Sequence, residues 1–450
     1  MSGRIRTEIL SRKYIAPSSP TPPHLRFFQL SLLDQLSPNN HRNVTLFFTA
    51  STAAAHNHNN YSLLSQFSFQ SQRLQISLSH SLTRFYPLAG RLHDAATIHC
   101  NDHGASYIEA RVHSDLSRFL ANPDFHTLQH FLPPNNNEIP QITEFPTANS
   151  NCSLLLLVRF TLFACGGTAL SVSVSRKFAD LPAFNTLLHY WTATCRGVPP
   201  PDVPDLGLGP SRFPPREIPE IISASGINTR ADKFTTRRFV FPASNVEELK
   251  RGIVTALFGR DNNNDKFQFQ FQFQPSRVEV VLALIWRSAV SAWSTKTGSF
   301  RPSAMFLAVN LRPRMEPPVP RTAMGNFLWP LAVTVEKESE LNLHVMVRKM
   351  RERMKEFVEK KAKRLKDEGG YGMAMEYIRE NEEMKEKEVV VYNCWSWSKN
   401  EMLEVDYGWG NPMSMSSVNR KMKNTDLVQF SGMNPSVVYR IPHNCSDEAP

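Results

Sequence analysis

Hydrophobic and polar residues alternate along several segments of the first half of the chain. Every second residue is apolar or small through much of residues 105–112 and 168–174, which predicts strands with one face toward a core. The longer segment 61–82 has the periodicity of a helix.

The second half repeats this mixture of elements. The sequence Phe239-Val-Phe241 predicts a strand, and Ser244 with Glu247 three residues later predicts a helix start with a capping box. Between residues 343 and 365, apolar residues recur at helical spacing beneath a basic surface, which predicts an amphipathic helix packed on a core. Strands that alternate with helices in both halves favour a two-domain α/β protein with mixed sheets.

Prolines mark the expected boundary between the halves. They are dense from Val198 to Pro219, and this density argues against a regular helix or a central strand there. We therefore expect an amino-terminal domain over residues 1–198, a linker over 199–231 and a carboxyl-terminal domain over 232–450. The Phe-Gln alternation that ends at Gln274 indicates a flexible crossover loop or an edge strand, and we assign it no chemistry.

Composition narrows the possible functions. The 450 residues include 41% hydrophobic and 20% charged residues, which is typical of a folded globular protein. The net charge of +10 allows a nucleic-acid or membrane partner, but much of the excess lies on the predicted amphipathic helix, and no basic motif with interleaved aromatic residues accompanies it. We expect neither partner. No signal peptide or membrane span is recognisable, so we expect a cytoplasmic protein.

The six cysteines lie far apart and form no C-x-x-C pair, so we expect free or buried thiols and no metal site.

The most informative segment runs from Leu170 to Trp191. A strand ends near Ser175, a turn holds residues 176–180, and a helix begins near Pro182, which suits a first helical turn. A turn between a strand and a helix can present side chains into a cleft. The segment resembles the H-x-x-x-D region of the BAHD acyltransferases, a plant family that moves acyl groups from coenzyme A to alcohols or amines.

The resemblance spans nearly the whole chain. Within the family, the sequence is most similar to the vinorine-synthase-like branch. Further segments that carry it are Ile9 to Pro22, Tyr86 to Leu92, Trp191 to Gly197, Asn310 to Met315, Ala323 to Asn326, and Asp406-Tyr-Gly-Trp-Gly410. It implies two similar chloramphenicol-acetyltransferase-like domains, with mixed sheets flanked by helices and a channel between the domains. It also implies a monomer that binds no cofactor permanently, with acyl-CoA as co-substrate and a small-molecule acceptor.

One position departs from the family pattern. Four residues before Asp180, where the family has its catalytic histidine, this chain has Arg176. A general base needs a pKa near the working pH, and a guanidinium stays protonated in proteins. Loss of such a base lowers the reaction rate by about 10²- to 10⁴-fold. A fixed cation suits a carboxylate or a developing oxyanion instead, and the adjacent Ser175 is expected to lie along the substrate channel.

Other motif residues carry structural roles in the resemblance. Asp180 is expected to hold the turn by pairing with an arginine, either Arg287 or one in the segment 310–315. The residues Asp406, Gly408, Trp409 and Gly410 are expected to support the coenzyme A channel from outside the reaction centre. Tyr407 stands where the family has phenylalanine.

Three histidines are candidates for a substitute base. His189 lies on the helix after the turn, where we expect a structural role, while sequence alone does not place His24 and His80 near the turn.

Three hypotheses about function stay open at this stage. The first is a divergent acyltransferase of plant specialised metabolism that uses an amine or a self-activating hydroxyl acceptor. The second is a lyase or cyclase in which Arg176 binds an anion. The third is a non-catalytic protein that binds a small molecule.

Overall fold

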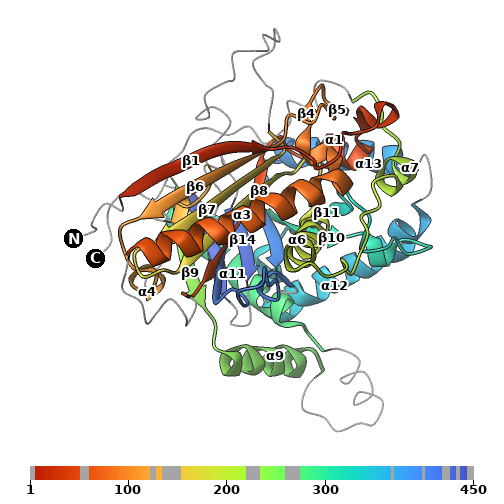
Figure 1. Ribbon diagram of the computed structural model, residues 1–450. Coiled ribbons are helices and arrows are strands. Elements are labelled where there is room, and N and C mark those ends of the chain that lie inside the picture. Colours follow the sequence, from red (N-terminus) through yellow and green to blue (C-terminus); the bar gives the residue numbers. More distant parts are fainter. Residues whose placement is uncertain are drawn as a thin grey trace. The chain divides into compact units, whose positions relative to one another are not determined.

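The fold is known from a computed structural model (Figure 1). It describes residues 6–50, 60–121, 128–133, 154–218, 234–258, 274–365, 369–397, 401–417, 426–431 and 436–442. The chain forms two compact units. Unit 1 comprises Met1–Ile218, Pro320–Phe327 and Glu401–Lys421, and unit 2 comprises Pro219–Val319, Leu328–Asn400 and Met422–Pro450. The proposed domain limits at residues 198 and 231 and the channel between domains remain predictions.

Unit 1 is built on a mixed sheet with the strand order β1-β6-β7-β8-β3-β13. The strands are β1 (Thr7–Ile15), β6 (Ala105–Val112), β7 (Leu156–Phe163), β8 (Thr168–Ser175), β3 (His41–Phe48) and β13 (Ser414–Ser416). Only β6 and β7 run parallel among these pairs. A smaller sheet joins β2 (Phe27–Gln29), β5 (Thr97–His99) and β4 (Arg91–Leu92).

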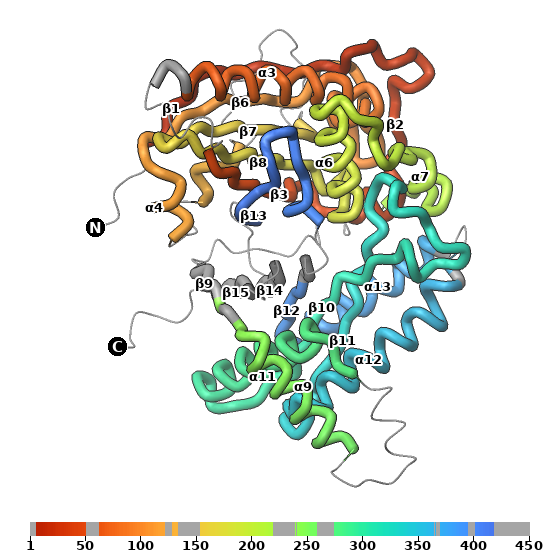
Figure 2. The backbone as a smooth tube through the Cα atoms, turned by 60° about the horizontal axis from the view of Figure 1, so that its bottom comes forward, coloured from red at the N-terminus to blue at the C-terminus, as the bar shows by residue number. Residues whose placement is uncertain are grey.

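Helices cover one face of the larger sheet of unit 1. The long helix α3 (Asn60–Arg84) lies along β6, β7 and β8 in both views and packs beside α6 (Leu181–Arg196) (Figure 2). The ring of Phe67 on α3 stacks on that of Phe160 on β7 at 4.7 Å. The apolar face of the sheet is thus buried beneath α3, as the helical periodicity of this segment requires. Shorter helices of unit 1 are η1 (Pro23–Leu25), α1 (Leu32–Leu36), η2 (Tyr86–Ala89), α4 (Leu116–Ala121), α7 (Leu208–Arg212) and η7 (Glu401–Leu403).

Unit 2 contains a second mixed sheet, with the order β11-β10-β12-β14-β15-β9. Its strands are β11 (Leu328–Val335), β10 (Ser303–Asn310), β12 (Val390–Trp397), β14 (Asp426–Ser431), β15 (Ser436–Pro442) and β9 (Phe234–Val240). Its helices are α9 (Ala243–Phe258), α11 (Arg277–Thr297), η4 (Arg312–Arg314), η5 (Glu338–Glu340), α12 (Leu343–Lys360), η6 (Ala362–Arg364) and α13 (Gly369–Glu386).

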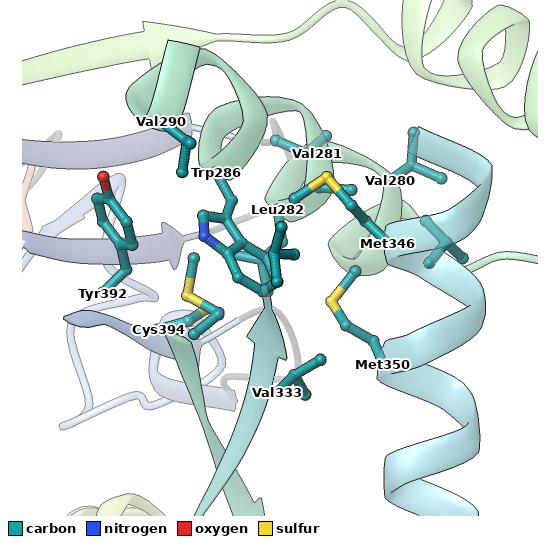
Figure 3. Close-up of a cluster of buried hydrophobic side chains, with 14 of the residues drawn as sticks. Val280, Val281, Leu282, Trp286, Val290, Val333, Met346, Met350, Tyr392 and Cys394 are labelled. Carbon is teal, nitrogen blue, oxygen red and sulfur yellow. The ribbon is translucent and has the colours of Figure 1, made fainter. Parts of the chain in front are cut away.

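The core of unit 2 forms around Trp286 of α11 (Figure 3). Its fully buried indole packs among aliphatic and sulfur-containing side chains that include Met346 and Met350 of α12 and Val333 of β11. The indole N–H donates to Ser303 Oγ at 3.0 Å, so the buried polar group is satisfied. The buried methionines confirm the amphipathic helix predicted from residue 343.

The structure corrects two local predictions. Helix α9 begins at Ala243, so Ser244 lies inside it and donates to Asn245 Oδ1 rather than capping the helix. The proline-rich segment does contain a helix, the five-residue α7, which includes Pro210. A proline fits there because the first N–H groups of a helix have no partner within the helix.

The predicted thiols are confirmed where the structure describes them. Cys100, Cys195 and Cys394 are buried and free, and Cys165 is exposed and free, whereas Cys152 and Cys445 lie outside the described residues. The Phe-Gln segment also lies outside them up to residue 273. None of the helices in the described part of the chain has both the length and the apolar character needed to cross a bilayer.

Candidate active site

The turn between β8 and α6 has the predicted form. Strand β8 ends at Ser175, and α6 begins at Leu181 with Asp180 as its N-cap. One carboxylate oxygen of Asp180 accepts the N–H of Ala183 at 3.0 Å, which satisfies a donor of the first helical turn. Pro182 occupies the first turn, as expected from its fixed backbone angle.

The second oxygen of Asp180 ties the turn to a distant segment of unit 1. It accepts the backbone N–H of Phe327 at 3.0 Å, and the Asp180 side chain is fully buried. The charge of Asp180 also favours the protonated form of the neighbouring Arg42, whose pKa burial lowers to about 10. These contacts give Asp180 a structural position. The predicted pairing with Arg287 or with the 310–315 segment involves the other unit and stays a prediction.

Asn326 connects the same turn to α1. Its side-chain amide donates to Asp34 Oδ1 at 2.8 Å and to the carbonyl of Arg176 at 2.7 Å, and its backbone N–H donates to Asp34 Oδ1 at 2.7 Å. Gly325, at φ +105°, lets the backbone approach the Asp34 carboxylate, since a Cβ there would lie 3.2 Å from Oδ2. The segment 323–326 therefore fixes the turn at residues 176–180 by linking it to Asp34 of α1. Sequence reasoning recognised this motif but missed Asp34.

Arg176 sits where the chain leaves β8. Its backbone N–H donates to the carbonyl of Asn40 at 2.9 Å, which fixes the turn against the start of β3. Burial, with a smaller effect from the charge of Arg42, lowers the pKa of the Arg176 guanidinium to about 9. It therefore remains a cation at neutral pH. Two buried guanidinium groups thus lie close enough at this end of the sheet to affect each other electrostatically.

His41 is a residue of this region that sequence reasoning missed. It begins β3 and lies opposite Ser175 in the antiparallel pair β3–β8. Its Nε2–H donates to the carbonyl of Leu154 at 2.7 Å, and burial lowers the pKa of the imidazole below 6.5. No local sequence signal marks it, because the pairing joins segments more than 130 residues apart.

The other candidate residues are placed as follows. The Ser175 hydroxyl is buried and accepts the N–H of Lys177 at 3.2 Å, so it helps to shape the turn. His24 and His80 are exposed. His189 on α6 has its Nε2 3.6 Å from Glu401 Oε2, and burial lowers the pKa of its imidazole. None of these three histidines has a contact with the turn among the described residues.

The segment from Asp406 to Gly410 forms a tight turn in unit 1. Asp406 Oδ1 accepts the N–H groups of Gly408 and Gly410 at 2.7 and 2.9 Å. Gly408 has φ +102°, and a Cβ there would lie 3.0 Å from the guanidinium of Arg73, so only glycine fits without strain. The ring of Trp409 stacks on that of Tyr407, with centroids 5.7 Å apart. These contacts stabilise the fold of the turn itself.

The motif at residues 310–315 lies in unit 2, at the end of β10. Asn310 Oδ1 accepts the N–H of Arg312 at 3.1 Å, and the carbonyl of Asn310 accepts from the guanidinium of Arg314 at 2.8 Å. Within the described ranges, no three His, Cys, Asp or Glu side chains are grouped so that they could hold a metal ion.

Comparison with known proteins finds similarity along nearly the whole chain. Residues 5–437 match the Transferase family. Stemmadenine O-acetyltransferase of Catharanthus roseus is 31% identical over 424 residues, covering 93% of this chain and 89% of the relative. The 17,18-epoxy-17-hydroxycur-19-ene N-malonyltransferase of Strychnos nux-vomica is 28% identical over 422 residues, covering 93% and 82%. The crystal structure of vinorine synthase superposes with a TM-score of 0.73 at 28% identity, covering 97% of this chain and 94% of that one. This likeness confirms the predicted two-domain α/β fold.

Proposed function

Because the chain belongs to the Transferase family, the BAHD acyltransferases, we propose that it transfers an acyl group from an acyl-CoA to a small-molecule acceptor in plant specialised metabolism. The observation that carries this proposal is the turn at residues 176–180. Asp180, Asn326 and Asp34 hold it with buried hydrogen bonds from separate segments of unit 1. These contacts fix the geometry of a largely buried turn, as a site that must position a reacting side chain requires.

The chemical class of the acceptor is inferred from Arg176, the residue at the start of this turn. We place Arg176 at the position of the family's catalytic histidine, because the chain has R-x-x-x-D there. A guanidinium with a pKa of about 9 stays charged at neutral pH and accepts no proton from an attacking hydroxyl. A neutral amine is already nucleophilic, and some hydroxyl substrates carry their own base. The rate of acyl transfer to these two kinds of acceptor therefore falls least when the histidine is absent.

Acylation of oxygen and acylation of nitrogen both occur among the similar proteins. One is named as an O-acetyltransferase and the other as an N-malonyltransferase, so relatives of about 30% identity modify oxygen as well as nitrogen. The proposed co-substrate is an acyl-CoA, as in the rest of the family, without a metal cofactor. We further propose that the protein works as a cytoplasmic monomer, with Ser175 along the path of the substrate.

In this scheme Arg176 contacts the thioester carbonyl. Its forked N–H groups can stabilise the negative charge that develops on the carbonyl oxygen when the acceptor attacks. The neighbouring Arg42 adds a second positive charge to the same end of the sheet. The Asp406–Gly410 turn is proposed to support the coenzyme A site from outside the reaction centre.

The two nearby guanidinium groups also favour a second candidate function. A lyase or cyclase would use Arg176 to bind the carboxylate of an anionic substrate, which planar, permanently charged groups recognise well. Such an enzyme would need no acyl-CoA. This difference separates it from the acyltransferase.

The test is thioester consumption by the purified protein. Acetyl-CoA and malonyl-CoA are each offered with a panel of amines and alcohols, and free thiol and acylated product are measured. We expect product with amines, and we expect Arg176→Gln to reduce the rate by about 10²-fold, the effect of removing one oxyanion donor. Arg84→Gln, which changes a cation at the end of α3, serves as the control and is expected to leave the rate unchanged.

The result that would overturn the proposal is the absence of both thioester consumption and coenzyme A binding by calorimetry. A metabolite comparison of plants with and without the protein then separates the remaining possibilities. A metabolite that accumulates in its absence and is converted by the native protein but not by Arg176→Ala would identify the lyase or cyclase. Binding without conversion would identify a non-catalytic protein.

A further inference from the structure

Two backbone contacts bring His41 to the turn that carries Arg176. His41 lies opposite Ser175 in the β3–β8 pair, so their Cβ atoms face the same side of the sheet about 5 Å apart. The carbonyl of Asn40, one residue before His41, accepts the N–H of Arg176 at 2.9 Å. The imidazole is therefore anchored at the strand end from which the turn departs.

The hydrogen bond to Leu154 sets the tautomer of His41. A carbonyl oxygen only accepts, so Nε2 must carry the hydrogen, and in the neutral ring Nδ1 then carries the lone pair. The described residues offer Nδ1 no hydrogen-bond partner. This is the arrangement of a general base, with one nitrogen held by an acceptor and the other available for a proton.

The exposure of His41 agrees with such a role. The residues that follow it on β3, from Arg42 to Phe48, are buried, whereas His41 itself is only partly covered. On the same face of the sheet it is followed by Asn43 and Thr45, which lie opposite Ser173 and Ser171. These four side chains are buried, and Thr45 Oγ1 lies 2.8 Å from Ser171 Oγ, so His41 is the least covered polar residue of this strand.

We propose that His41 is the general base of the acyl transfer and takes over the task that Arg176 cannot perform. This inference rests on the proposed function and extends its acceptors to ordinary hydroxyl groups. Two residues then act at the site where the family has one catalytic histidine. His41 activates the acceptor, and Arg176 stabilises the charge on the thioester carbonyl.

The proposed step transfers one proton from the acceptor through His41 to the leaving sulfur. The acceptor O–H gives its proton to Nδ1 of His41 as its oxygen attacks the thioester carbon, forming a C–O bond and a negatively charged tetrahedral intermediate. The intermediate collapses, the C–S bond breaks, and the proton on Nδ1 passes to the sulfur of coenzyme A. The products are the ester and free coenzyme A thiol, and His41 is again neutral.

The neutral imidazole that the step requires is favoured at this end of unit 1. Arg42 lies on the same strand, and Arg176 and Lys177 follow β8, so cations outnumber the buried carboxylates Asp34 and Asp180. Lys177 donates to the carbonyl of Gln35 at 2.6 Å, which keeps its charge near the turn. Burial of the ring lowers the pKa of His41 below 6.5 despite the hydrogen bond to Leu154, and this disfavours a second proton on the imidazole.

The test is His41→Gln, assayed with an alcohol acceptor between pH 5 and 9. Glutamine keeps a donor for the Leu154 carbonyl but is not basic, so a purely structural role of His41 would survive the change. We expect the rate at neutral pH to fall by about 10²- to 10⁴-fold. In the native protein the rate should fall with acidity below about pH 6.5, and this inflection should be absent in His41→Gln. His80→Gln, at an exposed position of α3, is expected to match the native protein.

A second variant provides rescue. In the double variant His41→Gln with Arg176→His a base returns at the neighbouring position, and alcohol acylation should rise above that of His41→Gln alone. A His41→Gln protein with a rate within threefold of native and the same pH profile would overturn the inference but leave the proposed function in place. A native profile without the acidic inflection would also overturn the inference, and this measurement needs no variant to fold. A native protein that consumes no acyl-CoA would overturn both.

Discussion

The carboxylate of Asp180 accepts the backbone N–H of Phe327 at 3.0 Å across 147 residues of sequence, while its other oxygen caps α6 at Ala183. One buried side chain therefore fixes both the start of a helix and a distant segment of unit 1. This is why the aspartate of the R-x-x-x-D sequence is structural, and why the geometry of the turn depends on it.

Replacing this side chain should destabilise the protein. Asp180→Ala removes the N-cap, at about 1 kcal/mol, and leaves the buried N–H of Phe327 without an acceptor, at about 1–3 kcal/mol. We therefore expect urea denaturation to report a loss of about 2–4 kcal/mol. Asp205→Ala removes an exposed carboxylate that accepts the N–H groups of Gly207 and Leu208 before α7, and should cost less than about 1 kcal/mol. Equal losses in the two variants would contradict the structural role of Asp180.

The strand, turn and helix around Arg176 could be predicted from the sequence because their signals are local. Alternation along β8 and the Asp-Leu-Pro start of α6 depend on residues within one or two turns of each other. The predicted capping box at Ser244 is wrong because a local pattern alone does not fix the first residue of a helix. A serine three residues before a glutamate fits the local pattern, but α9 already begins at Ala243, so the same residues lie inside it.

The supporting contacts of the turn could not be predicted in this way. Asp34 and Asn326 are 292 residues apart, and only the folded unit brings them together. His41 reaches Ser175 through a strand pairing, so its position depends on the order of strands in the sheet rather than on a motif. The sequence therefore offers His24, His80 and His189 as candidates but gives no signal for His41, which lies at the turn.

The buried carboxyl of Asp34 should make stability depend on pH. Burial raises its pKa from 3.8 to about 6, even though hydrogen bonds from Ser31 and Asn326 act in the opposite direction. The folded state therefore binds this proton more tightly than the unfolded state. Its stabilising contribution is complete below about pH 4 and is lost as the pH rises through about 6, a change of roughly 3 kcal/mol.

This dependence is measured by denaturant unfolding between pH 4 and 7. Asp34→Asn cannot titrate, so the difference between its curve and the native curve isolates the one group. We expect the native protein to lose stability relative to the variant as the pH rises. Two curves that stay parallel across this range would show that the pKa of Asp34 is not raised.

A single substitution should stabilise the turn at residues 406–410. Tyr407 is fully buried, and among the described residues its hydroxyl has no hydrogen-bond partner. Tyr407→Phe removes this unsatisfied group and should raise the free energy of unfolding by about 1 kcal/mol. Tyr107→Phe is the matched control, because the buried hydroxyl of Tyr107 lies 3.0 Å from Ser71 Oγ and its loss should be destabilising. A loss of stability in both variants, seen as a lower melting temperature, would mean that Tyr407 has a partner after all.

The central claim is that a permanent cation at position 176 works within an otherwise intact acyl-CoA transferase. Arg176→His tests it most directly, with an alcohol and an amine of the same carbon skeleton and product formation from acetyl-CoA as the measurement. We predict that the native protein acylates the amine faster than the alcohol. We predict that the variant raises the rate with the alcohol, by up to about 10²- to 10⁴-fold in the His41→Gln background, where no other base operates. If neither protein forms product and the native chain binds no coenzyme A, the claim is contradicted.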